Sequence, residues 1–120
     1  MRKKNSTNTE NEKRLKDTCG LTYAMLLIKG RWTINVMWSI HNGFNRYSLI
    51  KKDIEGISEK MLTQRLKDLE ETGLIAKQDL KDAASNVTYH LTQAGNAFIP
   101  CILTLDEWGN KVRPYTKTLT

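Results

Sequence analysis

The segment SEKMLTQRLKDLEETGLI, residues 58–75, decides how this chain folds. Its residues Leu62, Leu66 and Leu69 recur at i, i+4 and i+7, which is the spacing of one face of an α-helix. Ser58 is a good N-cap residue, and Gly73 interrupts the periodic pattern. The segment therefore predicts a helix with one buried face. Its other face is either an ordinary solvated surface or a surface that reads a partner.

The segments before this helix predict three further helices. Residues 21–28 and 32–41 are largely apolar and are separated at Gly30, so we expect both to belong to the core. Residues 45–54 predict a short helix in which Tyr47, Ile50 and Ile54 are available for burial. A turn at Gly56 then leads into Ser58. The order of helix, glycine-containing turn and helix indicates a helix-turn-helix.

The segments after the helix predict a hairpin and a last helix. Residues 74–80 and 87–92 have strand-forming character, and the turn residues 81–86 between them predict an exposed wing. Residues 92–112 predict a helix that Pro100 should kink or restart. Its wide apolar stripe exceeds what one small core covers, so homodimerisation is the simplest explanation. The expected interface residues are Phe98, Cys101, Ile102, Leu105, Trp108 and Val112.

Length and charge favour a single basic domain. The 120 residues predict a flexible arm at 1–12, one domain at 13–113 and a tail at 114–120. The expected fold class is α+β, mainly α: a winged helix-turn-helix with a C-terminal dimerisation helix. The net charge of +6 favours nucleic acid or an anionic surface, and residues 29–52 hold five basic residues and no acidic one.

Several function classes have no support in the sequence. No apolar run approaches the roughly 20 residues of a membrane span, and residues 1–18 lack the apolar stretch of a secretion signal, so we expect a cytoplasmic protein. Two cysteines in such a chain are expected to be reduced. His41 and His90 have no metal-ligand spacing to either cysteine. A phosphate loop, a nucleophile elbow and a paired carboxylate site are all absent, so we expect no enzyme, cofactor or metal.

The order of elements predicts how DNA would be bound. In a winged helix-turn-helix, the second helix of the pair enters the major groove. There Gln can bond adenine, Lys and Arg can bond guanine, and Thr can meet a thymine methyl or a phosphate. Phosphate contacts are expected from Arg46, Lys51, Lys77 and Lys81, although Asp79 and Asp82 argue against deep insertion of the wing. The candidates on the recognition helix are Ser58, Lys60, Thr63, Gln64, Arg65 and Lys67.

These motifs resemble the HxlR-type, MarR-like winged-helix transcription regulators of bacteria. The matching marks are Gly30-Arg31-Trp32, Arg46 to Leu49, Ile57-Ser58, Lys60 to Leu66, Gly73-Leu74-Ile75, Tyr89-x-Leu91-Thr92-x-x-Gly95 and Trp108-Gly109. The resemblance covers residues 19 to about 112. It implies a homodimeric repressor or activator with each recognition helix in a major groove of a pseudo-palindromic operator. The chain departs from the family's pattern at the wing, where it reads KDAASNVTYH.

The resemblance also implies a role for Cys19, because the family often carries a cysteine just before its first core helix. In similar members this thiol senses electrophiles or oxidants, which requires a thiolate. Lys13, Arg14 and Lys16 could lower its pKa if they lie nearby, and Asp17 would oppose them. Cys101 could then resolve an oxidised Cys19 into a disulfide between subunits, for which the two Cα atoms must lie within about 7 Å.

Three alternatives remain open at this stage. Cys101 could instead be a small core residue between Ile99 and Ile102. The same fold could act without redox sensing, controlled by a small ligand in the dimer cleft or by abundance alone. The domain could also be a winged-helix protein-interaction module whose basic face is incidental.

Overall fold

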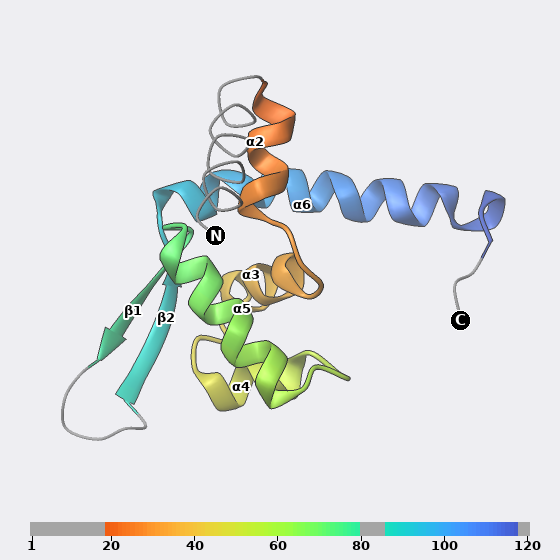
Figure 1. Cartoon of the computed structure of the whole chain (residues 1–120). Coiled ribbons are helices and arrows are strands. Elements are labelled where there is room, and N and C mark those ends of the chain that lie inside the picture. The colour runs from red at the N-terminus through yellow and green to blue at the C-terminus, as the bar shows by residue number, and fades with distance from the viewer. Residues whose placement is uncertain (1–18, 80–85, 118–120) are drawn as a thin grey trace, which may run out of the picture. The chain divides into compact units, whose positions relative to one another are not determined.

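A computed structural model describes residues 19–79 and 86–117 (Figure 1). They form a mainly helical fold with one small antiparallel sheet, as the sequence predicted. The chain divides into two units, one ending at Arg31 and one beginning at Trp32, and each is described by itself. The elements are α2 (Gly20–Leu27), α3 (Thr33–His41), α4 (Tyr47–Asp53), α5 (Glu59–Glu71), β1 (Ile75–Asp79), β2 (Val87–Leu91), α6 (Gln93–Val112) and the 3₁₀ turn η2 (Arg113–Tyr115).

Helix α5 confirms the prediction made from its sequence. Leu62, Leu66 and Leu69 are all buried, so the i, i+4, i+7 stripe faces the core. The hydroxyl of Ser58 accepts a hydrogen bond from the backbone N–H of Met61 at 3.0 Å and caps the helix. The turn between α4 and α5 contains Gly56 with a φ of +94°, a conformation that glycine adopts at little cost.

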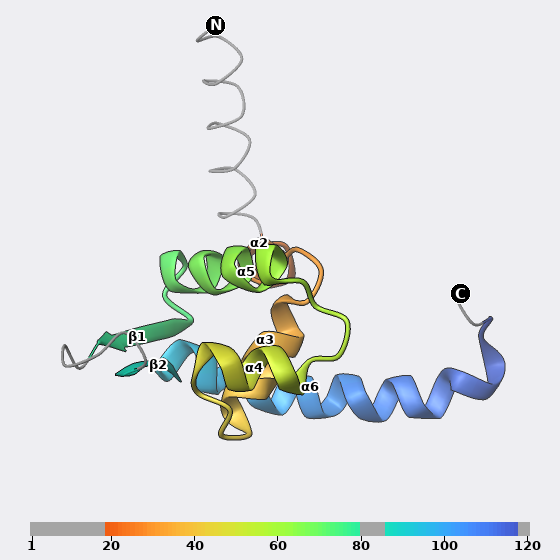
Figure 2. The same cartoon turned by 90° about the horizontal axis from the view of Figure 1, so that it is seen from below.

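Helix α3 lies at the centre of the second unit, where it contacts α4, α5, α6 and β2 (Figures 1 and 2). Val36 and Met37 on α3 are fully buried, as is Ile50 on α4. Each such side chain stabilises the folded state by about 1.5–3 kcal/mol when it is buried rather than exposed. Apolar packing against these helices therefore holds α5 in place. The remaining buried apolar residues of this core are Ile40, Ile54, Ile57, Leu74, Ile75, Ile99 and Ile102.

The predicted wing is an antiparallel hairpin of β1 and β2. Lys77 pairs with Tyr89, and Ile75 pairs with Leu91. The backbone N–H of Tyr89 also donates to the carbonyl of Asn45 at 2.9 Å, which ties the hairpin to the segment before α4. The predicted turn at 81–86 falls almost entirely outside the described residues, as do the arm at 1–12 and Lys81.

Helix α6 runs without a break from Gln93 to Val112, so the alternative that a new helix starts at Pro100 is wrong. Proline removes one backbone donor, and a helix of this length keeps enough of the other bonds to continue past it. At its beginning, the Thr92 hydroxyl donates to the carbonyl of Gly73 at 2.6 Å and accepts from the N–H of Gly95 at 3.2 Å. The start of α6 is thereby attached to the residues that follow α5.

Helix α2 is not the core helix that its apolar sequence predicted. None of its residues is buried, and Leu21 and Met25 are 73% and 56% exposed. Its sequence GLTYAMLL has apolar residues on every side, a pattern typical of a buried helix, and this pattern is the reason for the wrong prediction. Composition alone therefore overestimated its burial.

Candidate nucleic-acid interface and thiol site

The outward face of α5 gathers four of the predicted base-reading residues. Lys60, Thr63, Gln64 and Lys67 are all exposed, and their i, i+3, i+4 and i+7 spacing sets them on one side of the helix. Three carry a flexible amide or ammonium group suited to base edges in a major groove. Ser58 is exposed as well, but its hydroxyl is engaged in the helix cap.

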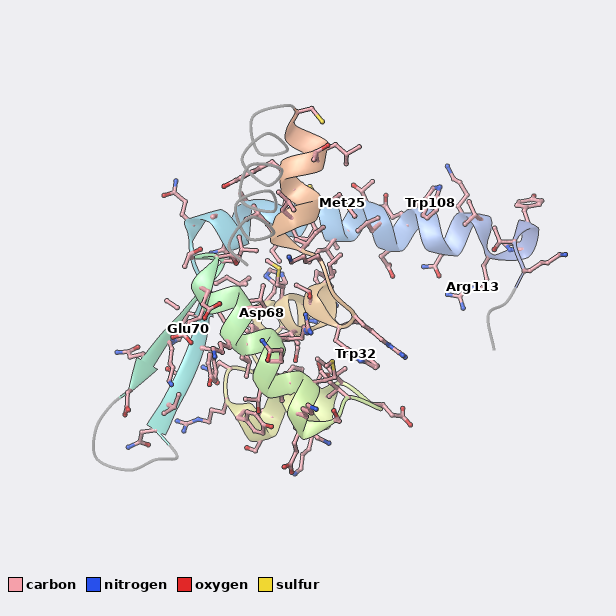
Figure 3. The ribbon with its side chains drawn as sticks, viewed as in Figure 1. Met25, Trp32, Asp68, Glu70, Trp108 and Arg113 are labelled. Carbon is pink, nitrogen blue, oxygen red and sulfur yellow. The ribbon has the colours of Figure 1, made fainter. Side chains whose placement is uncertain are left out.

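Two of the predicted residues on α5 are held by a carboxylate that the sequence analysis did not single out. Gln64 Nε2 donates to Asp68 Oδ1 at 2.8 Å, and Arg65 Nη1 lies 3.1 Å from Asp68 Oδ2. Asp68 is labelled in Figure 3. The i, i+4 and i, i+3 spacings were visible in the sequence and are the signal that could have revealed both pairs.

A tyrosine links α4 to the first turns of α5. The phenol of Tyr47 donates to the carbonyl of Glu59 at 3.1 Å and lies 3.2 Å from the hydroxyl of Thr63. Tyr47 is half-buried rather than a full core residue. Its bonds fix the angle at which α5 leaves the turn, and they engage one of the predicted DNA-contacting hydroxyls.

The predicted phosphate contacts surround α5. Arg46 precedes α4 as its N-cap residue, Lys51 lies in the last turn of α4, and Lys77 is exposed on β1. Lys67 and Lys77 line a cleft of about 340 Å³ between α5 and the hairpin. Both lysines therefore border the same space, although they come from different elements.

The same cleft contains Tyr89. Burial raises the pKa of Tyr89, and the nearby carboxylate of Glu70 and the phenol of Tyr47 raise it further. The phenol thus remains neutral at physiological pH and keeps its hydrogen as a donor. The cleft is accordingly lined by two lysines and by a tyrosine that is neutral at physiological pH.

Cys19 is the N-cap residue of α2, and its thiol is exposed. The Thr22 hydroxyl lies 3.2 Å from Sγ, and the backbone N–H of Thr22 donates to Sγ at 3.4 Å. The Thr22 side chain first, and then the backbone N–H groups of Thr22 and Leu21, lower the pKa of Cys19, while slight desolvation opposes them. Lys13, Arg14 and Lys16, which the sequence analysis expected to lower this pKa, and Asp17, which it expected to oppose them, lie outside the described residues.

The predicted dimer surface on α6 is partly exposed and partly core. Leu105 and Trp108 are 45% and 62% exposed, whereas Phe98 and Val112 are half-buried. Trp108 is labelled in Figure 3. Ile102 is buried within the chain, so it stabilises the core. Leu103 is also substantially exposed, and the sequence analysis missed it because it lies off the i, i+3, i+4 stripe.

Cys101 is exposed on α6. Ile99 and Ile102 on either side of it are buried, because a residue between two core positions of a helix points to another side. The alternative that Cys101 is a small core residue is therefore wrong.

Residues 19–79 and 86–117 offer neither a metal site nor a membrane span. They contain no group of three or more His, Cys, Asp or Glu side chains able to hold a metal ion. Within the same ranges, no helix combines the length and the apolar character of a membrane span.

A helix pair whose second helix exposes a polar face, followed by a hairpin, is the architecture of a winged helix-turn-helix. The family model of HxlR-like helix-turn-helix proteins matches residues 27–117, and the chain belongs to this family of transcriptional regulators. An HTH-type transcriptional regulator of Methanothermobacter thermautotrophicus, described as uncharacterised, is 35% identical over 91 residues, which cover 76% of this chain and 70% of that protein.

Solved structures agree with this assignment. A protein of Porphyromonas gingivalis W83 assigned to the MarR family of transcriptional regulators is 34% identical, with a TM-score of 0.69 over 78% of this chain and 91% of that one. The redox regulator HypR in its reduced form is 28% identical, with a TM-score of 0.68 over 78% and 92% of the two chains. The fold is therefore shared with regulators, one of which is named for its redox response.

Proposed function

We propose that this regulator binds a pseudo-palindromic operator as a homodimer and reads it with α5. The observation that carries the proposal is the exposed face of Lys60, Thr63, Gln64 and Lys67 on a helix whose opposite face is fixed in the core. The buried stripe prevents α5 from rotating, so these side chains enter a groove together. Arg46, Lys51 and Lys77 then contact phosphates and set the register.

Homodimerisation is supported by the exposed apolar side chains of α6. Leu105 and Trp108 are too large and too exposed to be explained by the core of one chain. A second copy of α6 covers them, and Cys101, Phe98 and Val112 lie on the same helix. The two α5 helices must then lie about 34 Å apart, because successive major-groove faces of DNA recur at that distance.

The proposed signal is the oxidation or alkylation of Cys19. Its support is the exposed thiol with a lowered pKa, because the thiolate is the reactive form. A hydroperoxide transfers one oxygen atom to the thiolate sulfur of Cys19, the O–O bond breaks, the second oxygen leaves as hydroxide or alkoxide, and the sulfur becomes a sulfenic acid. The thiolate of Cys101 from the partner subunit then attacks that sulfur, a disulfide forms, and hydroxide leaves as water after protonation. The similarity to HypR, a named redox regulator, supports this assignment.

DNA binding is tested by titrating duplex DNA with the reduced protein at several salt concentrations. Neutralisation of several phosphates by Lys and Arg predicts a steep loss of affinity as salt rises, with a slope of about −0.9 per phosphate contacted. The control is Lys52→Ala, an exposed lysine of α4 outside the proposed set. An absence of salt-dependent binding would contradict the proposal and favour a protein-interaction module.

A second candidate for the signal is a small ligand, and a specific groove favours it. The groove has a volume of about 560 Å³ and lies between α3 and the second half of α6. Ile34, Trp38 and Leu105 give it apolar walls, and Asp106 and Arg113 add charge. A Cys19→Ser protein that still responds fully to the natural inducer would support this candidate and exclude the thiol switch.

A further inference from the structure

We infer that Asp68 is a specificity-determining residue of α5, which orients the amide of Gln64 and holds Arg65 away from the DNA backbone. The inference rests on the proposed function, because it concerns how α5 reads DNA. Asp68 does not touch DNA in this account and acts as a positioning residue. Its two carboxylate oxygens are used separately, with Oδ1 accepting from Gln64 and Oδ2 lying against Arg65.

The contact with Asp68 decides which way the Gln64 amide faces. A free glutamine can exchange its oxygen and nitrogen by rotation about its last torsion, so it presents either order of donor and acceptor. The 2.8 Å bond from Nε2 to Asp68 fixes the nitrogen toward Asp68. Oε1 and the second N–H of Nε2 remain for a ligand. An acceptor beside a donor matches N6 and N7 of adenine in the major groove.

The contact with Asp68 also restrains Arg65. The Arg65 side chain is only 15% exposed, although arginine normally extends into solvent, and its Nε is buried without a hydrogen-bond partner in the described structure. A buried donor without a partner is unfavourable, so this conformation depends on the ion pair at the other end of the guanidinium. Without the carboxylate, Arg65 gains by extending toward a phosphate.

Both effects of Asp68 favour specific over non-specific binding. Orientation of Gln64 strengthens binding to one base pair, and restraint of Arg65 removes an attraction that every duplex offers equally. The negative charge of Asp68 adds a repulsion from phosphates that is also independent of sequence. Loss of Asp68 should therefore lower the preference for the cognate base and strengthen binding to unrelated DNA.

The test is a selection from a random 24-base-pair duplex library, followed by binding titrations on the selected site and on an unrelated duplex. Wild type, Gln64→Ala, Asp68→Ala, Asp68→Asn and the double variant Gln64→Ala/Asp68→Ala are compared. Glu71→Ala is the matched control, because it removes the same charge from an exposed position of the same helix. Asp68→Asn is nearly isosteric, so the test remains valid if Asp68→Ala perturbs the helix.

We expect Gln64→Ala to abolish one base preference and Asp68→Ala to weaken that same preference about tenfold, within the range of one bidentate contact. The double variant should match Gln64→Ala at that base pair, because Asp68 acts there through Gln64. Asp68→Asn can still accept from Gln64 and should keep the preference. It should nevertheless bind unrelated DNA more tightly, with a salt slope steeper by about 0.9 if Arg65 gains one phosphate.

Two results would overturn the inference, and they are distinguishable. If Asp68→Ala and Glu71→Ala give the same base preferences and salt slopes, Asp68 is an ordinary surface charge and only this inference fails. If wild type selects no motif at all, sequence-specific reading by α5 is refuted, and the role of Asp68 fails with it.

Discussion

The close contact between α6 and the turn after α5 sets the change in the free energy of unfolding that we expect for a substitution at Gly95. Gly95 is buried, and a Cβ added there would overlap the carbonyl oxygen of Leu74 and lie 3.2 Å from both the carbonyl carbon of Leu74 and a methyl group of Leu91. A backbone carbonyl cannot rotate away as a side chain can. It also accepts a hydrogen bond from the N–H of Thr92 at 3.1 Å, which any displacement would weaken.

Gly95→Ala should therefore lower the free energy of unfolding by about 2 kcal/mol. Overpacking of this kind costs about 3 kcal/mol when the obstacle is rigid, and the helix preference of alanine over glycine offsets about 1 kcal/mol. Gly109→Ala is the control, because Gly109 lies in the same helix with nothing within 4 Å of an added Cβ. It should stabilise by about 0.5–1 kcal/mol.

The assay is equilibrium urea unfolding of both variants and wild type at one protein concentration, since association changes apparent stability. The two substitutions are chemically identical, so opposite signs would isolate the contact with Leu74. Equal changes in stability would refute the reasoning, because the close approach of α6 to the end of α5 would then have no energetic weight.

Further substitutions test the cap of α5, the thiol of Cys19 and the proposed DNA-binding surface. Ser58→Ala should destabilise by about 1 kcal/mol in urea unfolding because it removes the cap of α5, whereas Ser58→Thr should retain most of that stability. Thr22→Val should raise the pKa of Cys19, because it removes the side-chain hydrogen bond that lowers this pKa most. The thiolate fraction at pH 7 then falls, so iodoacetamide should label Cys19 more slowly. Thr22→Ser keeps the hydroxyl and should react like wild type. Gln64→Ala should lower the binding free energy for DNA by about 1–3 kcal/mol at one base pair, whereas Arg46→Ala should weaken binding to all duplexes alike. If both variants behave in the same way across sequences, α5 is not the helix that reads the bases.

Helix α5 was predictable because its signals are local. The leucine stripe, the Ser58 cap and the glycine turns act within one helix or one turn, so the sequence contains all of their partners. The hairpin was predictable for the same reason. The helical extents of α3 and α4 also agree with the expected segments to within a few residues.

Features that depend on distant residues were not predictable. The close approach of Gly95 on α6 to Leu74, in the turn between α5 and β1, joins residues 21 positions apart, and no periodicity reveals it. The exposure of α2 depends on whether another surface packs against it, and the composition of the helix does not reveal this. Cys19 was singled out, but the cause assigned to its reactivity was basic neighbours; cysteine is not a preferred cap residue, so its cap geometry with Thr22 gave no sequence signal.

The most direct test of the account is fluorescence anisotropy with the DNA upstream of the protein's own gene, measured with reduced protein and again after diamide treatment. The reduced protein should bind tightly and in a salt-dependent way, and oxidation should change this binding clearly. Cys19→Ser should abolish the change without loss of binding by the reduced protein. A disulfide-linked dimer should appear on a non-reducing gel in wild type alone. Unchanged binding after complete oxidation of Cys19 would contradict the thiol switch, and no binding in either state would contradict the proposed reading of DNA by α5.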